Sequence, residues 1–231
     1  SSSGVWLSMT SLNQFSSLSL TTEKMNSNKQ ANSANPALSM IMDRGNTLNN
    51  SMASISSKVK KLNRHQKYRY DAGEFGRQAA MAAQLIDAGI DAPVLKIKLD
   101  GFDTHENQIW RHPNLLRDLG LGLAGLRQSL IRSGHWDSTL IMTYSEFGRR
   151  ALENESEGTD HGTAAPHFML SGAIKGGIWG AHPDLGDLIE GDMQFTMDYR
   201  SVYASILSDW FKIPLNRFSK YSNENLLSIY A

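Results

Sequence analysis

The stretch Thr139-Leu140-Ile141-Met142-Thr143-Tyr144 is a short, nearly continuous apolar run of strand length. A run of this kind is typical of a buried strand in a parallel sheet, because both faces of such a strand are covered. A second strand is predicted over residues 94–99, where apolar residues alternate with lysines. The two predicted strands lead directly into the polar segments 100–105 and 145–149.

A helix is predicted between these two strands. Its leucines recur at spacings of three and four, with Pro113 at its start and Gly134 at its end. A strand–helix–strand order implies a right-handed crossover and a mainly parallel sheet with helices on its faces. The predicted fold class is therefore α/β, with a mainly parallel sheet that is flanked by helices.

Further elements extend the predicted core, which we take to cover residues 66–231. An apolar stripe predicts a helix that begins near Asp71 and has its C-terminal cap at Gly89. Another strand is predicted over residues 167–170, and Asp198 is expected to cap a last helix.

Residues 1–65 form a separate region that is rich in serine and asparagine. Asn35-Pro36 has the pattern of a helix N-cap followed by proline at the first helical position. Apolar residues then follow near helical spacing, although Gly45 interrupts the pattern. We interpret this region as a peripheral helical segment, a helix pair outside the core.

The composition excludes several classes of protein. The 231 residues carry 23 basic and 23 acidic side chains and no cysteine. A balanced charge without a basic run argues against a nucleic-acid partner, and no apolar run approaches the roughly twenty residues of a membrane span. The absence of cysteine excludes disulfides and is compatible with export. No signal segment is found, because the sequence starts with Ser1-Ser2-Ser3-Gly4 and has no basic region followed by an apolar core.

Metal-ligating residue types gather in two glycine-flanked segments. Asp103 and His105 are two positions apart, so in an extended segment both side chains point to one side. Asp160 and His161 lie between Gly158 and Gly162, in a loop that can turn two adjacent side chains toward one point. These four residues are the candidate ligands of a divalent metal ion. The alternatives are an Asp103 cap on the following segment and a structural network of hydrogen bonds around Asp160 and His161.

Glu146 and Arg149, which follow the strand predicted over residues 139–144, are the candidate catalytic residues. Glu146 is either a ligand or general base, or the partner of a nearby arginine in an ion pair. Arg149 is either a clamp for an anionic ester oxygen or a member of a surface ion pair. Thr104 and Ser145 are nucleophiles by residue type, but hydroxyl groups near turns are far more often local caps. His112, His135 and His182 are interpreted as ordinary surface or loop histidines.

Three motifs together resemble a known group of bacterial proteins. Gly101-Phe102-Asp103-Thr104-His105, followed by Gln108, matches the signature G-[WF]-D-T-H-x-x-Q. The segments 145–149 and 158–162 read SEFGR and GTDHG. In this order the motifs are similar to those of the bacterial domain-of-unknown-function family 1501, within the alkaline phosphatase and sulfatase superfamily. The resemblance covers roughly residues 68–215, and the earlier part resembles the variable helical region of the family.

The resemblance implies a doubly wound fold with a metal centre at the ends of the strands. The implied cofactor is a divalent ion, with zinc first and calcium, magnesium or manganese as alternatives. The implied activity is metal-dependent hydrolysis of phosphate or sulfate esters, so the expected partner is a small anionic ester or a glycan. Members of the family are similar to exported proteins, which implies a periplasmic or exported location.

The chain also departs from the superfamily pattern. No motif before residue 66 supplies the expected aspartate and nucleophile, so the chain resembles the C-terminal half of a longer protein. The missing half would then be a partner, or the uncovered sheet would form a homodimer. Phe147 also stands beside Glu146 where relatives carry an Asp-His pair. This second departure motivates the alternative function, a non-catalytic exported binding or surface-assembly protein on the same scaffold.

Overall fold

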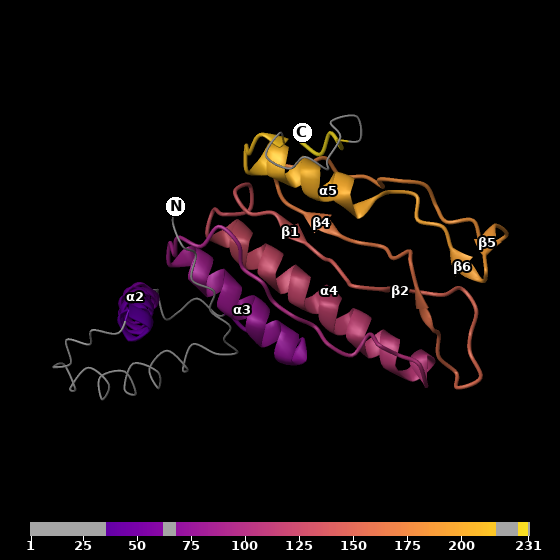
Figure 1. Cartoon of the computed structure of the whole chain (residues 1–231), viewed down its shortest axis with the longest axis horizontal. Helices are drawn as coiled ribbons and strands as arrows, with labels where there is room; N and C mark the ends of the chain where they lie inside the picture. Colours follow the sequence, from indigo (N-terminus) through magenta and orange to yellow (C-terminus); the bar gives the residue numbers. More distant parts are fainter. Residues whose placement is uncertain (1–35, 62–67, 216–225, 231) are drawn as a thin grey trace. The chain divides into compact units, whose positions relative to one another are not determined.

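The structure, a computed structural model, describes residues 36–61, 68–215 and 226–230. The chain divides into two compact units. One unit comprises Ser1–Asp100 and Leu115–His135, and the other comprises Gly101–Asn114 and Trp136–Ala231. Figure 1 labels the helices and strands. None of the helices in the described ranges combines the length and the apolar character that a membrane crossing requires.

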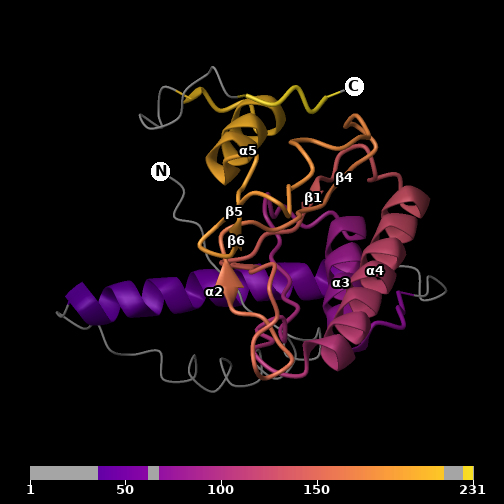
Figure 2. The ribbon, with the colours of Figure 1, turned by 90° about the vertical axis from the view of Figure 1, so that its right-hand side faces the viewer.

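The first unit begins with helix α2 (Pro36–Lys60). This helix continues through Gly45 without a break (Figure 2), although glycine lowers helix propensity. Gly45 therefore interrupts the apolar pattern but not the helix. Asn35, the predicted N-cap, and any second helix of the predicted pair before residue 36 lie outside the described residues. Lys58 Nζ donates to the Gly89 carbonyl at 2.8 Å and so connects α2 to the segment after the next helix.

Helix α3 (Gly73–Asp87) and the part of helix α4 (Gln108–Arg132) that belongs to the first unit pack closely, as the predicted apolar stripes require. A Cβ atom on Gly122 would lie 2.5 Å from the ring of Phe75, and one on Gly125 would lie 2.4 Å from the ring of Tyr70. The glycines that weaken α4 as an isolated helix therefore make room for two aromatic rings. Tyr70 also donates from its hydroxyl to Ser129 Oγ at 2.7 Å, and burial raises its pKa.

The strand predicted over residues 94–99 is wrong for the described structure, where this segment has no regular secondary structure. A side chain takes the place of a neighbouring strand there. The Lys98 N–H donates to Gln78 Oε1 at 2.9 Å, and Gln78 Nε2 donates to the Lys98 carbonyl at 3.1 Å. The amide of Gln78 thus satisfies both peptide groups of Lys98, and no ladder is needed at that residue.

Helix α4 begins five residues before Pro113, the predicted start, and contains that proline. The first N–H groups of a helix have no acceptor within the helix. In α4 the Gln108 N–H donates to the Glu157 carbonyl at 2.8 Å, and the preceding Asn107 N–H donates to the Ser156 carbonyl at 3.1 Å. This tertiary contact, which local sequence does not encode, places the start of the helix at Gln108.

Among its described residues, the second unit has three short antiparallel strand pairs. Strand β1 (Ile141–Met142) pairs with β4 (Met169–Leu170), β2 (Gly148–Arg149) with β3 (His161–Gly162), and β5 (Leu188–Ile189) with β6 (Asp192–Met193). The described fold is therefore α/β in the general sense, with helices and small antiparallel sheets. The strands predicted over residues 139–144 and 167–170 exist only as β1 and β4, and their pairing is antiparallel rather than parallel.

The second unit ends with helix α5 (Tyr199–Ser205) and a π-helical turn, η1 (Ile206–Trp210). The predicted N-cap is confirmed, because Asp198 Oδ1 accepts from the Arg200 N–H at 2.8 Å. Asp198 also forms an ion pair with the guanidinium of Arg200. At the other end of α5, the Leu227 N–H donates to Ser205 Oγ at 2.8 Å.

Replacement of the cap should destabilise the protein in a pH-dependent way. We expect Asp198→Ala to lower the free energy of unfolding by about 1 kcal/mol at neutral pH. The side-chain hydrogen bond from Arg200, followed by its backbone N–H, lowers the pKa of Asp198. The contribution of Asp198 is therefore present above its unfolded pKa of about 3.9 and is lost as the pH falls through the folded value. Urea unfolding at neutral and acidic pH measures this difference. The exposed Asp187 provides the control variant Asp187→Ala, and equal losses in the two variants would contradict the role as a cap.

Candidate metal centre

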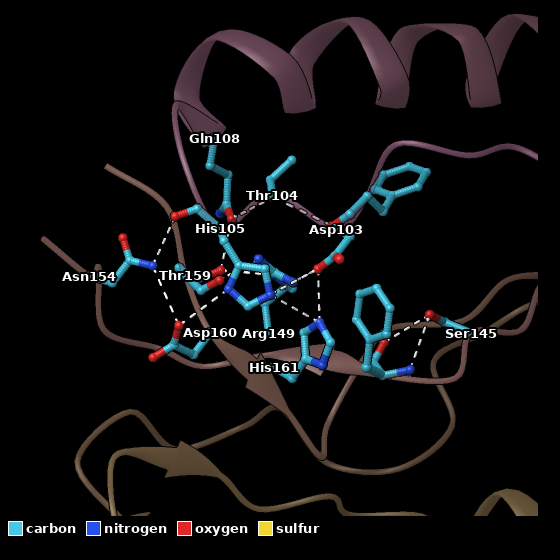
Figure 3. A network of polar contacts seen from close by, with 12 residues as sticks. Asp103, Thr104, His105, Gln108, Ser145, Arg149, Asn154, Thr159, Asp160 and His161 are labelled. Atoms are coloured by element: carbon cyan, nitrogen blue, oxygen red, sulfur yellow. Dashed lines mark hydrogen bonds and ion pairs between the residues drawn. The ribbon is translucent and has the colours of Figure 1, made fainter. Parts of the chain in front are cut away.

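The three sequence motifs meet within the second unit. Asp103 and His105 lie in the loop before α4, Arg149 lies on β2, and His161 lies on β3. Arg149 and His161 are directly opposite each other in the antiparallel pair, so their side chains leave the same face of this ribbon. Figure 3 shows both of them directed toward Asp103.

Three ligand atoms form a small triangle. Asp103 Oδ1 lies 2.8 Å from His161 Nε2 and 3.0 Å from His105 Nε2, and the two Nε2 atoms are 3.3 Å apart. A tetrahedral zinc ion with bonds of about 2.0–2.1 Å separates its ligand atoms by about 3.3 Å. The triangle therefore needs only a slight expansion to become one face of such a tetrahedron. Two imidazoles and one carboxylate are also a donor set that suits zinc in catalytic sites.

Asp160 lies outside the triangle, on the opposite side of the His105 ring (Figure 3). Its Oδ1 is 3.3 Å from His105 Nδ1, the nitrogen that faces away from Asp103. Asn154 Nδ2 lies 3.5 Å from the same oxygen and 3.0 Å from the carbonyl of His105. The structure thus brings three of the four predicted ligands together and places the fourth where it orients one of them.

Arg149 is held in place by hydrogen bonds and forms an ion pair with Asp103. Its side chain is only 15% exposed. Nε donates to Thr159 Oγ1 at 2.9 Å, Nη2 donates to the Thr159 carbonyl, and Nη1 lies 3.2 Å from Asp103 Oδ1. The guanidinium is therefore used mainly to hold Asp103, and the predicted function as an anion clamp stays a prediction.

Phe147 has a function that the sequence did not indicate. Its ring is stacked on the His161 ring, with the centroids 4.0 Å apart and the planes at 5°. A phenylalanine provides no ligand atom, but this contact restricts the orientation of a histidine that does. The guanidinium carbon of Arg149 lies 5.6 Å from the centroid of the same phenyl ring.

The two ligand-bearing loops touch along their backbones. The Thr159 N–H donates to the Thr104 carbonyl at 3.2 Å. A Cβ atom on Gly158 would lie 2.2 Å from the carbonyl carbon of His105, so position 158 has no room for a side chain. Asn154 closes the turn, because its Oδ1 accepts from the Ser156 and Gly158 N–H groups at 2.9 and 3.0 Å. The glycine and the asparagine together allow the close approach.

A partly buried polar network beside the triangle was not recognised in the sequence. Thr104 is fully buried, and its hydroxyl lies 2.9 Å from both Gln108 Oε1 and His112 Nε2. Gln108 Oε1 also accepts from Thr159 Oγ1 at 2.7 Å. His112 is therefore not an ordinary surface histidine, and its pKa is lowered by burial and by the charge of Arg149. The glutamine in the motif, three positions after His105, was the one sequence signal that pointed to this network.

Other candidates lie apart from the triangle. The Glu146 side chain is exposed, and no hydrogen bond or ion pair joins it to another residue in the part of the chain that the structure describes. Ser145 Oγ is hydrogen-bonded to the backbone of Phe147, as expected of a local cap. His182 is also local, since its Nδ1 lies 3.1 Å from the carbonyl of Pro183.

The contacts of the two aspartates favour their ionised forms. The hydrogen bond with His161 lowers the pKa of Asp103, and Arg149 and His105 act in the same direction. The hydrogen bond from Asn154 lowers the pKa of Asp160, and His105 adds to this effect. Both carboxylates are therefore charged at neutral pH, which is the form that can ligate a cation or accept a proton from an imidazole.

The fold and the site together define an α/β protein whose β2–β3 ribbon and preceding loop form a cluster of possible metal ligands. A family comparison matches residues 9–214 to a family described as a protein of unknown function, DUF1501. Because the match covers most of the chain, the protein belongs to this family. The match begins well before residue 68, where the recognisable motifs start. No curated protein matches the chain, and no solved structure matches it.

Proposed function

We propose that Asp103, His105 and His161 bind one divalent metal ion, zinc in the first place, and that the centre hydrolyses phosphate or sulfate esters. The observation that carries the proposal is the convergence of three ligand atoms from two loops within 3.3 Å of one another. The contacts of the two His105 ring nitrogens explain why this convergence supports a metal site.

The contacts of His105 favour a cation between its ring and the other two ligands. When a neutral ring carries its single proton on Nδ1, that N–H faces Asp160 Oδ1 at 3.3 Å. Nε2 then presents a lone pair toward Asp103 Oδ1 at 3.0 Å and toward His161 Nε2. Electron-rich atoms at these distances repel each other unless a proton or a metal ion lies between them. One metal ion relieves all three contacts at once, as in carboxylate–histidine–zinc arrangements.

The accessibility of the triangle favours a reactive site over a structural one. The side chains of Asp103, His105 and His161 are 58%, 48% and 49% exposed. Structural zinc sites have four protein ligands and are closed, whereas catalytic sites have three ligands and an open position. An ion held there would supply Lewis acidity to an ester oxygen.

The surrounding residues hold the ligands in position. Asp160 and Asn154 orient His105, Arg149 holds the carboxylate of Asp103, and Phe147 supports His161. Removal of such supporting contacts typically lowers metal affinity by 10- to 100-fold in known sites. Glu146 stays a predicted general base, although no contact connects it to the triangle.

The non-catalytic alternative is supported by the state of the hydroxyl groups. Thr104 lies between two ligands but is fully buried, and its hydroxyl is occupied by Gln108 and His112. Ser145 is bonded to local backbone. Neither residue is placed as a nucleophile in the described structure. A protein that binds the metal without turning over an ester would therefore be a binding or assembly protein.

The resemblance to the alkaline phosphatase and sulfatase superfamily supports the ester class, with a small anionic ester or a glycan as the partner. It also supports a periplasmic or exported location, with which the cysteine-free composition is compatible. A doubly wound parallel sheet belongs to the same proposal, and so does the assignment of the chain to the C-terminal half of a longer protein.

Elemental analysis tests the proposed centre. We expect protein purified without chelator to contain about one divalent ion per chain, because the site has one set of three ligands. The ion should be removed by a chelator, and added Zn²⁺ should restore it. Less than about a tenth of an equivalent of zinc, iron, manganese, calcium or magnesium would contradict the proposal.

An activity assay on the same samples separates the two functions. Hydrolysis of para-nitrophenyl phosphate or sulfate that disappears on chelation and returns with metal supports the esterase. Stoichiometric metal without turnover of either ester supports the binding protein. The chelated sample is the control in both cases, because it has the same chain without the ion.

A further inference from the structure

Gln108, the first residue of α4, connects the two loops that carry the ligands. Its Oε1 accepts from the Thr104 hydroxyl at 2.9 Å and from the Thr159 hydroxyl at 2.7 Å. Its backbone N–H donates to the Glu157 carbonyl at 2.8 Å. One residue thus holds both loops through three hydrogen bonds, and Figure 3 shows Gln108 together with Thr104 and Thr159.

The two threonines are sequence neighbours of the proposed ligands. Thr104 stands between Asp103 and His105, and Thr159 directly precedes Asp160-His161. A shift of either threonine therefore moves a ligand. Both threonines are buried, at 0% and 8% exposure, so water cannot replace the glutamine as the partner of their hydroxyls.

The directions of the hydrogen bonds form a consistent chain. The Thr104 hydroxyl has a single proton. That proton points to Gln108 Oε1, and His112 Nε2 lies 2.9 Å from the same hydroxyl oxygen. The Thr159 hydroxyl likewise donates to Gln108 while it accepts from Arg149 Nε. Arg149 in turn reaches Asp103, so the chain of hydrogen bonds returns to the triangle.

We infer that Gln108 is a positioning residue, and that its carbonyl oxygen keeps the 103–105 and 159–161 segments at the spacing that the three ligands require. The expected effect on metal affinity rests on the proposed function. The coupling of the two loops rests on the hydrogen bonds alone. Gln108 touches none of the three ligand atoms, so it acts entirely through the two threonines.

The test uses three variants of the full chain. Gln108→Leu keeps a similar size and removes the acceptor, and Gln108→Glu keeps an oxygen that can accept from both hydroxyls. Gln128→Leu is the matched control, because Gln128 is exposed on the same helix. We expect Gln108→Leu to weaken Zn²⁺ binding by roughly tenfold in competition with a chromophoric chelator. It should also change the visible absorption of the Co²⁺-substituted protein, which reports coordination geometry.

Amide hydrogen exchange supplies a readout that is independent of metal. The Thr159 N–H donates to the Thr104 carbonyl, so we expect it to exchange faster in metal-free Gln108→Leu than in the parent. Gln108→Glu should restore slow exchange, Zn²⁺ affinity and the Co²⁺ spectrum, and Gln128→Leu should match the parent throughout.

The outcomes separate this inference from the proposed function. A parent protein that binds no metal contradicts the proposed function, and the exchange at Thr159 then decides the role of Gln108 alone. The inference is overturned if Gln108→Leu matches the parent in affinity and exchange. It is also overturned if Gln108→Glu is as impaired as Gln108→Leu, or if Gln128→Leu shows the same losses.

Discussion

His161→Ala is expected to weaken Zn²⁺ binding by roughly a hundredfold or more, because it removes a ligand rather than a residue that supports one. The substitution deletes the imidazole whose Nε2 lies 2.8 Å from Asp103 Oδ1 and 3.3 Å from His105 Nε2. The remaining two donors leave the ion without a third protein ligand. Competition against a chromophoric chelator measures the change in affinity.

The fold itself should tolerate the loss of His161, because the ring is about half exposed and takes no part in the apolar core. We therefore expect the metal-free variant to unfold at nearly the same urea concentration as the metal-free parent. His182→Ala provides the control, since His182 is exposed and its Nδ1 lies 3.1 Å from the carbonyl of the next residue. If both variants hold zinc as tightly as the parent, His161 is a structural residue and the proposed centre is wrong.

Gly158→Ala should produce a large loss of stability. The added Cβ would lie 2.2 Å from the carbonyl carbon of His105, 2.4 Å from its oxygen and 2.5 Å from the backbone nitrogen of Glu106. All three are backbone atoms, so no side chain can rotate away, and the loops must separate. Overpacking of this kind typically costs about 1–3 kcal/mol, and backbone contact places this variant at or above the upper end.

The separation should also act on the metal site, because His105 lies on one of the displaced loops and His161 on the other. Urea unfolding of the metal-free protein measures the stability, and chelator competition measures the affinity. Gly176→Ala is the matched control, since a Cβ atom at Gly176 would meet nothing within 4 Å. A Gly158→Ala variant as stable as the control would show that the two loops are not in close contact.

Local sequence patterns predicted the helices of the chain better than its strands. Helix α3 and the cap at Asp198 agree with their patterns, because apolar periodicity and N-caps are decided by nearby residues. Strands depend on partners far along the chain. The 94–99 segment has the alternation of a strand, but the side chain of Gln78 satisfies Lys98, and no strand pairs with it in the described ranges.

The candidate site was predictable by residue type and only partly by role. The sequence marked four candidate ligands from the spacing of Asp103 and His105 and from the glycines around Asp160 and His161. The structure places these four residues in one region. Which of them face the same point depends on the register of β2 against β3, which no local pattern encodes. That register turns His161 toward Asp103, while Asp160 contacts the other nitrogen of His105.

The proposed ion would link two segments that lie far apart in the sequence. His105 and His161 are 56 positions apart, and the strand pairs around them are only two residues long. An ion shared by both residues would be a cross-link that closes a long loop in a sequence without cysteine. Chain-entropy arguments assign about 4 kcal/mol to a covalent link across a loop of this length. The supply of metal would then change the free energy of unfolding, as oxidation does for a secreted protein that is cross-linked by disulfides.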